Sequence, residues 1–301
     1  MARRKWQWTK KQLDKLNQAQ EILNELEAYK PLTLRQIYYQ FVGKGYIENK
    51  VSEYGMLSNL LKWARIDGYV SWDSIEDRVR AYHNGAGFDD KDQFIEQELD
   101  NFLHGYKRNL LQSQENYIEA WIEKDALTAI FKRVAMPYCV SVVVCRGFSS
   151  VSFLNDFRIR LTYQTDKKPV VLYFGDFDPS GVEMLEAMKT TLQDELNIKN
   201  IEFRRKALLK DDIYIHKLPH SPKALKYTDT RAKKHVTAYG EIAVELDALP
   251  PVILEGKIRD AIQSEIDINL FNKEVERHST ELGLLNNFKT RVSEFVGSGF
   301  K

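Results

Sequence analysis

The stretch 169-PVVLYFGDFDPSG-181 decides the expected fold of this 301-residue chain. A near-continuous apolar run ends at Phe174, and an acidic turn then leads into a segment that predicts a helix from Gly181 to about residue 196. Apolar runs of this kind are typical of strands buried on both faces, as in a parallel sheet covered by helices. The stretch therefore predicts one strand, one turn and one helix of an α/β domain.

The same alternation of strand and helix patterns precedes this stretch. We expect earlier strands at 117–122 and 140–145, and earlier helices at 125–135 and 150–163. Residues 113–301 therefore predict a parallel sheet flanked by helices. Its carboxy-terminal elaboration mixes strand and helix patterns and ends in an amphipathic helix around 270–282.

Residues 1–80 have a helical pattern instead. Apolar residues at three- and four-residue spacing predict helices at 9–29, 34–42 and 53–68. With a short strand expected at 69–72, this is the order of a winged-helix domain, whose third helix can enter a DNA groove. Lys62 and Arg65 share one face of that third helix and are candidate nucleic-acid-binding residues. Residues 81–112 predict a helical linker with its hinge at 84–87.

The composition is that of a soluble globular protein, with 43% apolar and 29% charged residues. Because 44 basic residues balance 43 acidic ones, attraction to nucleic acid depends on local basic clusters, at 3–15 and 201–240. A basic cluster is more often a solvated face than a binding site. The two cysteines, the lack of a secretory signal and the lack of a membrane-length apolar run predict a cytoplasmic protein.

Acidic residues follow two of the expected strands. Glu123 ends the first strand, and Asp176 and Asp178 follow the third, with a spacing that points both aspartates to one side. Ligands of open parallel sheets bind beyond the carboxyl ends of the strands, and three converging carboxylates suit Mg²⁺. Asp178 before Pro179 is also a good helix N-cap, and a lone Asp-x-Asp is usually no more than that. The strand-end glutamate favours the metal site.

A tyrosine pair lies in the second expected helix. Tyr38 falls inside its apolar stripe and is expected in the core, whereas Tyr39 falls at the margin, four residues after Arg35 and on the same side. A phenol has a pKa near 10, so it needs help to act as a nucleophile at neutral pH, and Arg35 could supply that help. The alternative role for Tyr39 is an aromatic that packs against a neighbouring surface.

Three segments together resemble a known family. They are Ile122-Glu123-Lys124-Asp125-Ala126, Arg146-Gly147-Phe148 and Gly175-Asp176-Phe177-Asp178-Pro179-Ser180-Gly181. They are similar to the Toprim domain of the A subunits of type IIB topoisomerases (topoisomerase VI) and of the related meiotic double-strand-break proteins. Residues 227–231 and 244–250 also resemble that family, and residues 34–39 are similar to its winged-helix segment with the catalytic tyrosine.

The resemblance implies a DNA-cleaving enzyme. Glu123, Asp176 and Asp178 would bind Mg²⁺, and Tyr39 would be the nucleophile, with Arg35 beside it. Lys124 and Arg146, which lie within the matching segments, are further candidates for nucleic-acid contacts. The family acts as a homodimer in which the tyrosine of one subunit meets the metal of its partner. No ATP-binding signature is visible, so directed strand passage would need a separate ATPase subunit.

Two other functions stay open at the level of sequence. In the first, a Toprim nuclease hydrolyses DNA or RNA with water, and Tyr39 has no catalytic role. In the second, the chain is a DNA-binding subunit that does not cut, and its carboxylates are structural.

Overall fold

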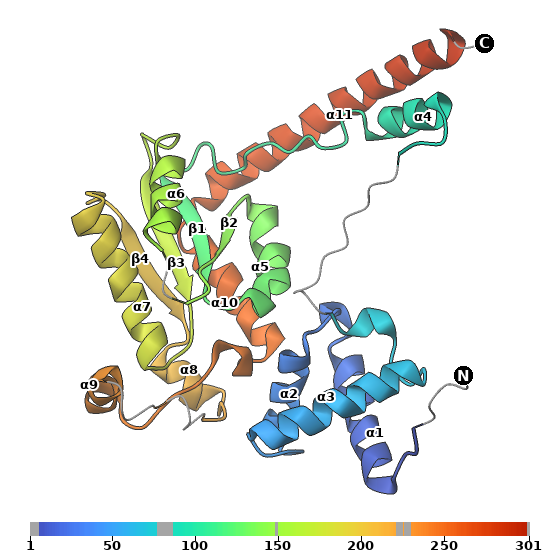
Figure 1. The fold of residues 1–301 in the computed structure, drawn as a ribbon. Coiled ribbons are helices and arrows are strands. Elements are labelled where there is room, and N and C mark those ends of the chain that lie inside the picture. Colours follow the sequence, from blue (N-terminus) through green and yellow to red (C-terminus); the bar gives the residue numbers. More distant parts are fainter. Residues whose placement is uncertain (1–5, 77–86, 148–149, 221–224, 226–229, 300–301) are drawn as a thin grey trace.

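A computed structural model describes residues 6–76, 87–147, 150–220, 225 and 230–299. It contains a helical amino-terminal part and an α/β part that lie side by side, and a long helix that projects away from both (Figure 1). The mixed α/β class expected from the sequence is confirmed.

The amino-terminal part is built from three helices around one apolar core. The helices are α1 (Lys10–Glu25), α2 (Leu34–Gly43) and α3 (Val51–Ile66), and the short η1 (Glu27–Tyr29) follows α1. Thr9 and Thr33 cap α1 and α2, each in a reciprocal capping box with the glutamine three residues later. Ile22, Phe41 and Leu57 are fully buried between the helices. The three expected helices are therefore confirmed.

The prediction of a strand at 69–72 is wrong. After Gly68, whose positive φ of 83° ends α3, the chain turns into the 3₁₀ helix η2 (Trp72–Ser74). The nearest β pairing is an isolated parallel bridge between Leu32 and Ile75. A strand needs a partner along its length, and here the neighbouring segment of the chain pairs through a single residue. No β wing follows α3 among the described residues.

The α/β part has a sheet of four parallel strands in the order β2-β1-β3-β4. The strands are β1 (Asn116–Ile122), β2 (Ser141–Val144), β3 (Lys168–Phe174) and β4 (Glu202–Ala207). Ala120 in β1 lies opposite Val142 in β2 and Leu172 in β3. The first three strands match the expected ones closely, whereas β4 was not expected from its charged sequence.

Helices cover both faces of this sheet. On one face α5 (Thr128–Ala135) and α10 (Pro251–Gln263) bury the side chains of Leu172 and Phe174. On the other face α6 (Val151–Leu161) and α7 (Pro179–Thr190) bury Trp121 and Tyr173. This alternation along β3 is what a strand buried on both faces requires.

The other elements of the α/β part connect these strands and helices. They are η3 (Asp125–Leu127), η4 (Met136–Tyr138), the π-helical turn η5 (Thr191–Glu195), α8 (Lys210–Ile215), α9 (Thr230–Tyr239) and η7 (Leu246–Ala248).

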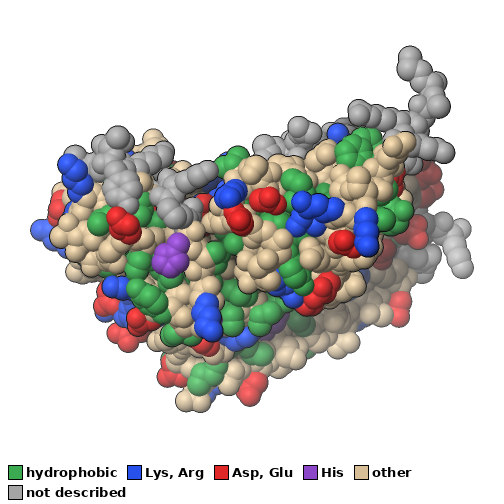
Figure 2. All heavy atoms as spheres, turned by 90° about the horizontal axis from the view of Figure 1, so that it is seen from below, with side chains coloured by type: hydrophobic (Ala, Val, Ile, Leu, Met, Phe, Trp, Pro, Cys, Tyr) green, Lys and Arg blue, Asp and Glu red, His purple; other side chains and the backbone are tan. Residues whose placement is uncertain are grey.

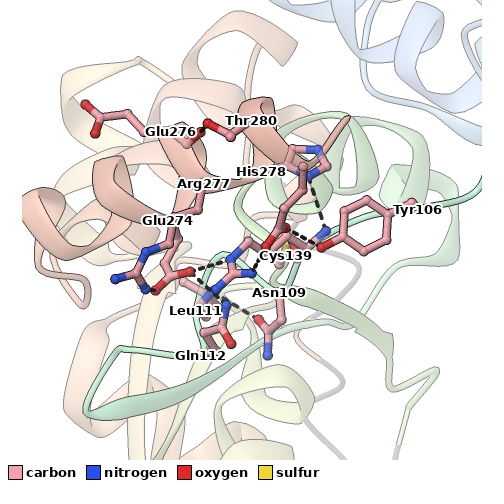
Figure 3. A network of polar contacts seen from close by, with 12 residues as sticks. Tyr106, Asn109, Leu111, Gln112, Cys139, Glu274, Glu276, Arg277, His278 and Thr280 are labelled. Atoms are coloured by element: carbon pink, nitrogen blue, oxygen red, sulfur yellow. Dashed lines mark hydrogen bonds and ion pairs between the residues drawn. The ribbon is translucent and has the colours of Figure 1, made fainter. Parts of the chain in front are cut away.

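The projecting helix is α11 (Ile268–Gly299), which is longer than the helix expected at 270–282. Its base is held by Arg108, whose guanidinium lies 2.6 Å from both Glu274 and Glu281. Glu274 also accepts a hydrogen bond from the side chain of Gln112 at 2.7 Å (Figure 3). Farther out, α4 (Lys91–Asn101) lies beside α11 (Figure 1). α4 falls in the expected linker at 81–112, and most of the expected hinge at 84–87 lies outside the described residues. Among the described helices, none is both long and apolar enough to cross a membrane.

Candidate active site

The carboxyl ends of β1 and β3 meet at a topological switch point. β1 and β3 are neighbours, but the chain continues from β1 to β2 on one side and from β3 to β4 on the other. In open α/β sheets this arrangement leaves the crevice where ligands bind. Glu123 follows β1 there, and its backbone N donates to the carbonyl oxygen of Phe174, 3.0 Å away. The two strands thus deliver their acidic residues to one place.

Glu123 and Asp176 are adjacent. Oε2 of Glu123 accepts a hydrogen bond from the backbone N of Asp176 at 2.9 Å. The turn is crowded here, because a Cβ on Gly181 would lie 2.4 Å from the carbonyl oxygen of Asp176 and 3.0 Å from Oε2 of Glu123. Asp178 caps α7 by accepting from the backbone N of Gly181 at 2.7 Å. Asp178 is therefore the helix cap that its sequence allows, and it also lies beside the other two acids.

This gathering of acids disfavours their ionisation. Burial raises the pKa of Glu123 to about 7, and the neighbouring Asp176 and Asp178 contribute in the same direction. Burial also raises the pKa of Asp178, again with a contribution from Asp176. Clustered carboxylates with raised pKa values are typical of sites that bind a cation or move protons.

Lys124 is the cation that the structure places among these acids. Its Nζ lies 2.7 Å from Oδ2 of Asp176 and 3.4 Å from Oε2 of Glu245. Burial alone would lower the pKa of Lys124, but the attraction and hydrogen bond of Asp176, together with the attraction of Asp247, outweigh burial and raise that pKa. The other oxygen of Asp176, Oδ1, accepts from the backbone N of Leu246 at 2.9 Å. Asp176 is thus held from both sides, by an ammonium and by a backbone donor.

Asp247 is a buried acid whose place in this cluster could not be read from the sequence. It lies in η7, is 2% exposed, and its two carboxylate oxygens have no hydrogen-bond partner. Its Oδ2 forms an ion pair with Nε of Arg35, 3.0 Å away. Burial raises the pKa of Asp247 to about 6, although Lys124 and Arg35 oppose this. Apart from the family resemblance of residues 244–250, nothing in the sequence around Asp247 indicates that it lies near the acidic cluster.

Arg205 is a second residue that the sequence did not identify. Its guanidinium lies beneath the acidic turn and donates to the carbonyl oxygens of Gly175 at 3.1 Å and Gly181 at 3.2 Å, and to that of Asp176. From the sequence it belonged to a basic run at 204–206 that could have faced nucleic acid. Its neighbour Arg204 is paired as well, with Glu202 and Glu265. This part of the expected basic cluster therefore supports the fold.

Tyr39 is buried on the side of the molecule where the acidic cluster lies. α2 packs against η7, and Arg35 forms ion pairs with both Glu245 and Asp247. Tyr39 is 5% exposed, as buried as Tyr38, because η7 covers the margin of the apolar stripe at which the sequence places it. The Arg35 guanidinium carbon lies 5.9 Å from the centre of the Tyr39 ring. Burial raises the pKa of Tyr39; Arg35 opposes this, and Asp247 and Asp176 add to it.

Tyr38 and three of the residues predicted to contact nucleic acid have other partners than the acidic cluster. Tyr38 is 5% exposed and belongs to the apolar core, as the sequence predicts, and its hydroxyl donates to Asn49 at 3.0 Å. Arg146 follows β2, is paired with Asp125 and has a side chain that is 72% exposed. Lys62 and Arg65 lie on α3, where they stack on Trp63 and Trp72 at 5.4 and 5.2 Å.

Charge is mixed over the surface. Figure 2 shows Lys and Arg side chains interspersed with Asp and Glu side chains on the face that it draws. No large area of Lys and Arg side chains alone is visible on the described part of that face.

The donor set fits a divalent cation that would compete with Lys124. Within the described ranges, no three His, Cys, Asp or Glu side chains are arranged to hold a metal ion as they stand. However, the Lys124 ammonium already provides a positive charge at Asp176, and the pKa of Glu123 is raised by burial and, to a lesser extent, by the negative charge of Asp176 and Asp178. Carboxylate oxygens with these properties are the ligands that Mg²⁺ prefers. Glu123, Asp176 and Asp178 would hold the ion.

Comparison with known proteins adds no relative. The sequence matches no model of a known protein family. A search of the curated proteins likewise finds no significant match. The chemistry of the site is therefore argued from its own residues.

Proposed function

We propose that this chain cuts the DNA backbone by transesterification, with Tyr39 as the nucleophile and Mg²⁺ held by Glu123, Asp176 and Asp178. One observation carries the proposal: three carboxylates gather at the switch point of the sheet, and the helix that bears Tyr39 packs against η7 at the same rim. The resemblance to topoisomerase VI A subunits, with its Toprim and winged-helix domains, supports the same reaction.

The reaction needs no redox cofactor. The Tyr39 oxygen loses its proton and bonds to phosphorus while the bond from phosphorus to one sugar oxygen breaks. The leaving sugar oxygen then takes up a proton. Bound Mg²⁺ would polarise a phosphoryl oxygen and stabilise the charge that develops there. One phosphodiester replaces another, so the step can run backwards and rejoin the strand.

The surroundings of Tyr39 link its reactivity to the acidic cluster. Burial, Asp247 and Asp176 all raise the pKa of Tyr39, and Arg35 lowers it. Positive charge gained at Asp176 would therefore favour the phenolate. The Arg35 guanidinium is also close enough to Tyr39 to hold the phosphate that is being cut.

Breaks in both strands would follow from two chains acting together. The family resemblance favours a homodimer, in which each chain supplies one tyrosine. Strand passage driven by ATP would require a separate ATPase subunit. Lys62, Arg65, Lys124 and Arg146 are the side chains that would contact the nucleic acid.

A second reaction is hydrolysis of DNA or RNA, with water in place of Tyr39. The burial of Tyr39 favours it, because a phenol that is 5% exposed must become accessible before it can attack a strand. This reaction uses the same three carboxylates, so the two proposals differ in the nucleophile alone.

Supercoiled plasmid and Mg²⁺, followed by detergent and protease, separate these functions. Wild type should leave protein-linked DNA ends, and Tyr39→Phe and Asp176→Asn should leave the plasmid intact. Tyr38→Phe is the matched control, because it removes the neighbouring hydroxyl and should still cut. Free ends produced by Tyr39→Phe would establish hydrolysis. DNA effects that persist in Asp176→Asn would leave a DNA-binding subunit that does not cut.

A further inference from the structure

The helix that bears Tyr39 is tied to the acidic cluster of its own chain. Arg35 on α2 forms an ion pair with Glu245 and lies 3.0 Å from Asp247, and both acids belong to the segment that contacts Asp176 and Lys124. These contacts cross from the amino-terminal part to the α/β part without a second subunit.

Other contacts join the same two parts. Arg133 on α5 donates to the carbonyl oxygen of Ala28 at 2.6 Å and stacks on the ring of Tyr29 at 4.4 Å. The side chain of Asn49, which follows α2, donates to the carbonyl oxygen of His220 at 3.2 Å. Because these attachments lie at separate places, they fix the orientation of α2 relative to the α/β part as well as its distance.

Asp247 favours one position of α2 against η7. Its oxygens are fully buried and have no hydrogen-bond donors, so its charge depends on the cations nearby. A buried carboxylate without a partner is strongly unfavourable, and Arg35 can meet Asp247 when α2 lies on η7. Tyr39 lies one helical turn after Arg35, so the same pairing sets where its phenol lies.

We propose that each chain completes its active site by itself: the Arg35–Asp247 pair seats Tyr39 on the carboxylate cluster of the same chain. Arg35 and Asp247 are positioning residues in this arrangement, and one chain cuts one strand. The inference rests on the proposed transesterification. It differs from the family expectation, in which the tyrosine meets the metal of the partner subunit.

Mixing two inactive variants tests the proposal. Tyr39→Phe keeps the carboxylates, and Asp176→Asn keeps the tyrosine, so a mixed pair of chains would restore one complete site if sites formed between subunits. We expect no plasmid nicking when the two variants are co-expressed with different tags and purified through both, or simply mixed if they stay monomeric. Nicking by the mixture would overturn the proposal, while the wild-type reaction would still stand.

The positioning role has its own signature. Asp247→Asn should lower the maximal single-turnover rate of protein–DNA linkage by about 10- to 100-fold, while the Mg²⁺ concentration for half-maximal rate stays the same. Asp247→Glu should restore part of the rate. A shift in the Mg²⁺ requirement with an unchanged maximal rate would mean that Asp247 binds the ion, and would overturn its positioning role.

A cross-link decides the arrangement even if no cutting is found. Cysteines replacing Asn49 and His220 lie outside the site and across the joint between the two parts. A short bismaleimide should join them within one chain and give a monomer of altered mobility, and the two single variants control for Cys139 and Cys145. A covalent dimer that forms in the double variant but in neither single variant would overturn the proposal. Intrachain linkage in a protein that does not cut would retain the seating of α2 and reject the proposed function.

Discussion

Glu119 and Glu123 lie four residues apart at β1, and both are acids in a largely buried setting, but their surroundings are opposite. Glu119 is 0% exposed and accepts from Tyr117 at 2.5 Å, from Trp121 at 2.7 Å and from Arg160 at 2.7 and 3.0 Å. Glu123 has one backbone donor, and its other neighbours include two aspartates. Glu119 is fully buried and Glu123 is partly buried, and the clearest difference between the two acids is the supply of donors.

The comparison shows what each acid is suited for. Glu119 satisfies three side chains and ties α6 to β1 through Arg160, as buried charged groups in stable cores must. The charge of Glu123 lacks such compensation, and its pKa is raised by burial. Glu119 is a structural residue, and Glu123 is the one poised to bind a cation.

The largest expected effect is on cutting. Glu123→Gln should slow plasmid cleavage by about 10²–10³-fold, the usual loss when one preorganised electrostatic group is removed from an active site. Glu119→Gln should cut at a normal rate at a temperature where it is folded. Equal loss in both variants, with both folded by circular dichroism, would erase the distinction.

Next in size is the effect on stability. Glu119→Gln removes the charge-assisted bonds to Arg160, and we expect it to lower the free energy of unfolding by about 3 kcal/mol. Glu123→Gln should raise it slightly at pH 8, because a neutral amide replaces a carboxylate that is difficult to ionise. Urea unfolding measures both, and a shift of the same sign would contradict the comparison.

The crowded turn beside Glu123 should resist a methyl group. Gly181→Ala would place a Cβ against the backbone of Asp176, and we expect a loss of about 2 kcal/mol, typical of overpacking. Gly283→Ala is the matched control, because this glycine of α11 has nothing within 4 Å of an added Cβ. That change should stabilise the helix by up to about 1 kcal/mol. Thermal unfolding of both variants gives the answer.

The smallest expected effect is the dependence of stability on pH. The folded-state pKa of Glu123 is raised from 4.5 to about 7, so its contribution is fully present below about pH 4.5 and is lost as the pH rises through 7. We expect a decline on the order of 1 kcal/mol over this window without divalent ions, and a smaller decline in Glu123→Gln. Mg²⁺ should reverse the loss above pH 7. Stability that rises across this window in wild type relative to Glu123→Gln would contradict the assignment.

The sequence predicted the strands that carry the acids, but not everything that surrounds them. Near-continuous apolar runs located β1 and β3, and their ends located Glu123 and Asp176. β4 was missed because Arg204-Arg205-Lys206 interrupts its apolar pattern, even though those side chains are paired in the fold.

The rest of the site depends on tertiary packing. Asp247 reaches the cluster from a segment some seventy residues after Asp176, and no local pattern shows that it is buried without donors. The burial of Tyr39 likewise comes from η7, which covers the margin of α2 that the helical pattern alone left open. Contacts between side chains that are distant in the sequence cannot be predicted from the spacing of apolar and polar residues.

The length of α11 has a consequence for how the molecule moves in solution. At about 1.5 Å per residue, its 32 residues extend roughly 48 Å. A compact chain of 301 residues would have a radius of gyration of about 19 Å. A helix this long that leaves the body near its base, where Arg108 holds it, should raise the radius measured by small-angle scattering and slow rotational diffusion. The protein should therefore behave hydrodynamically as a larger particle than its mass suggests.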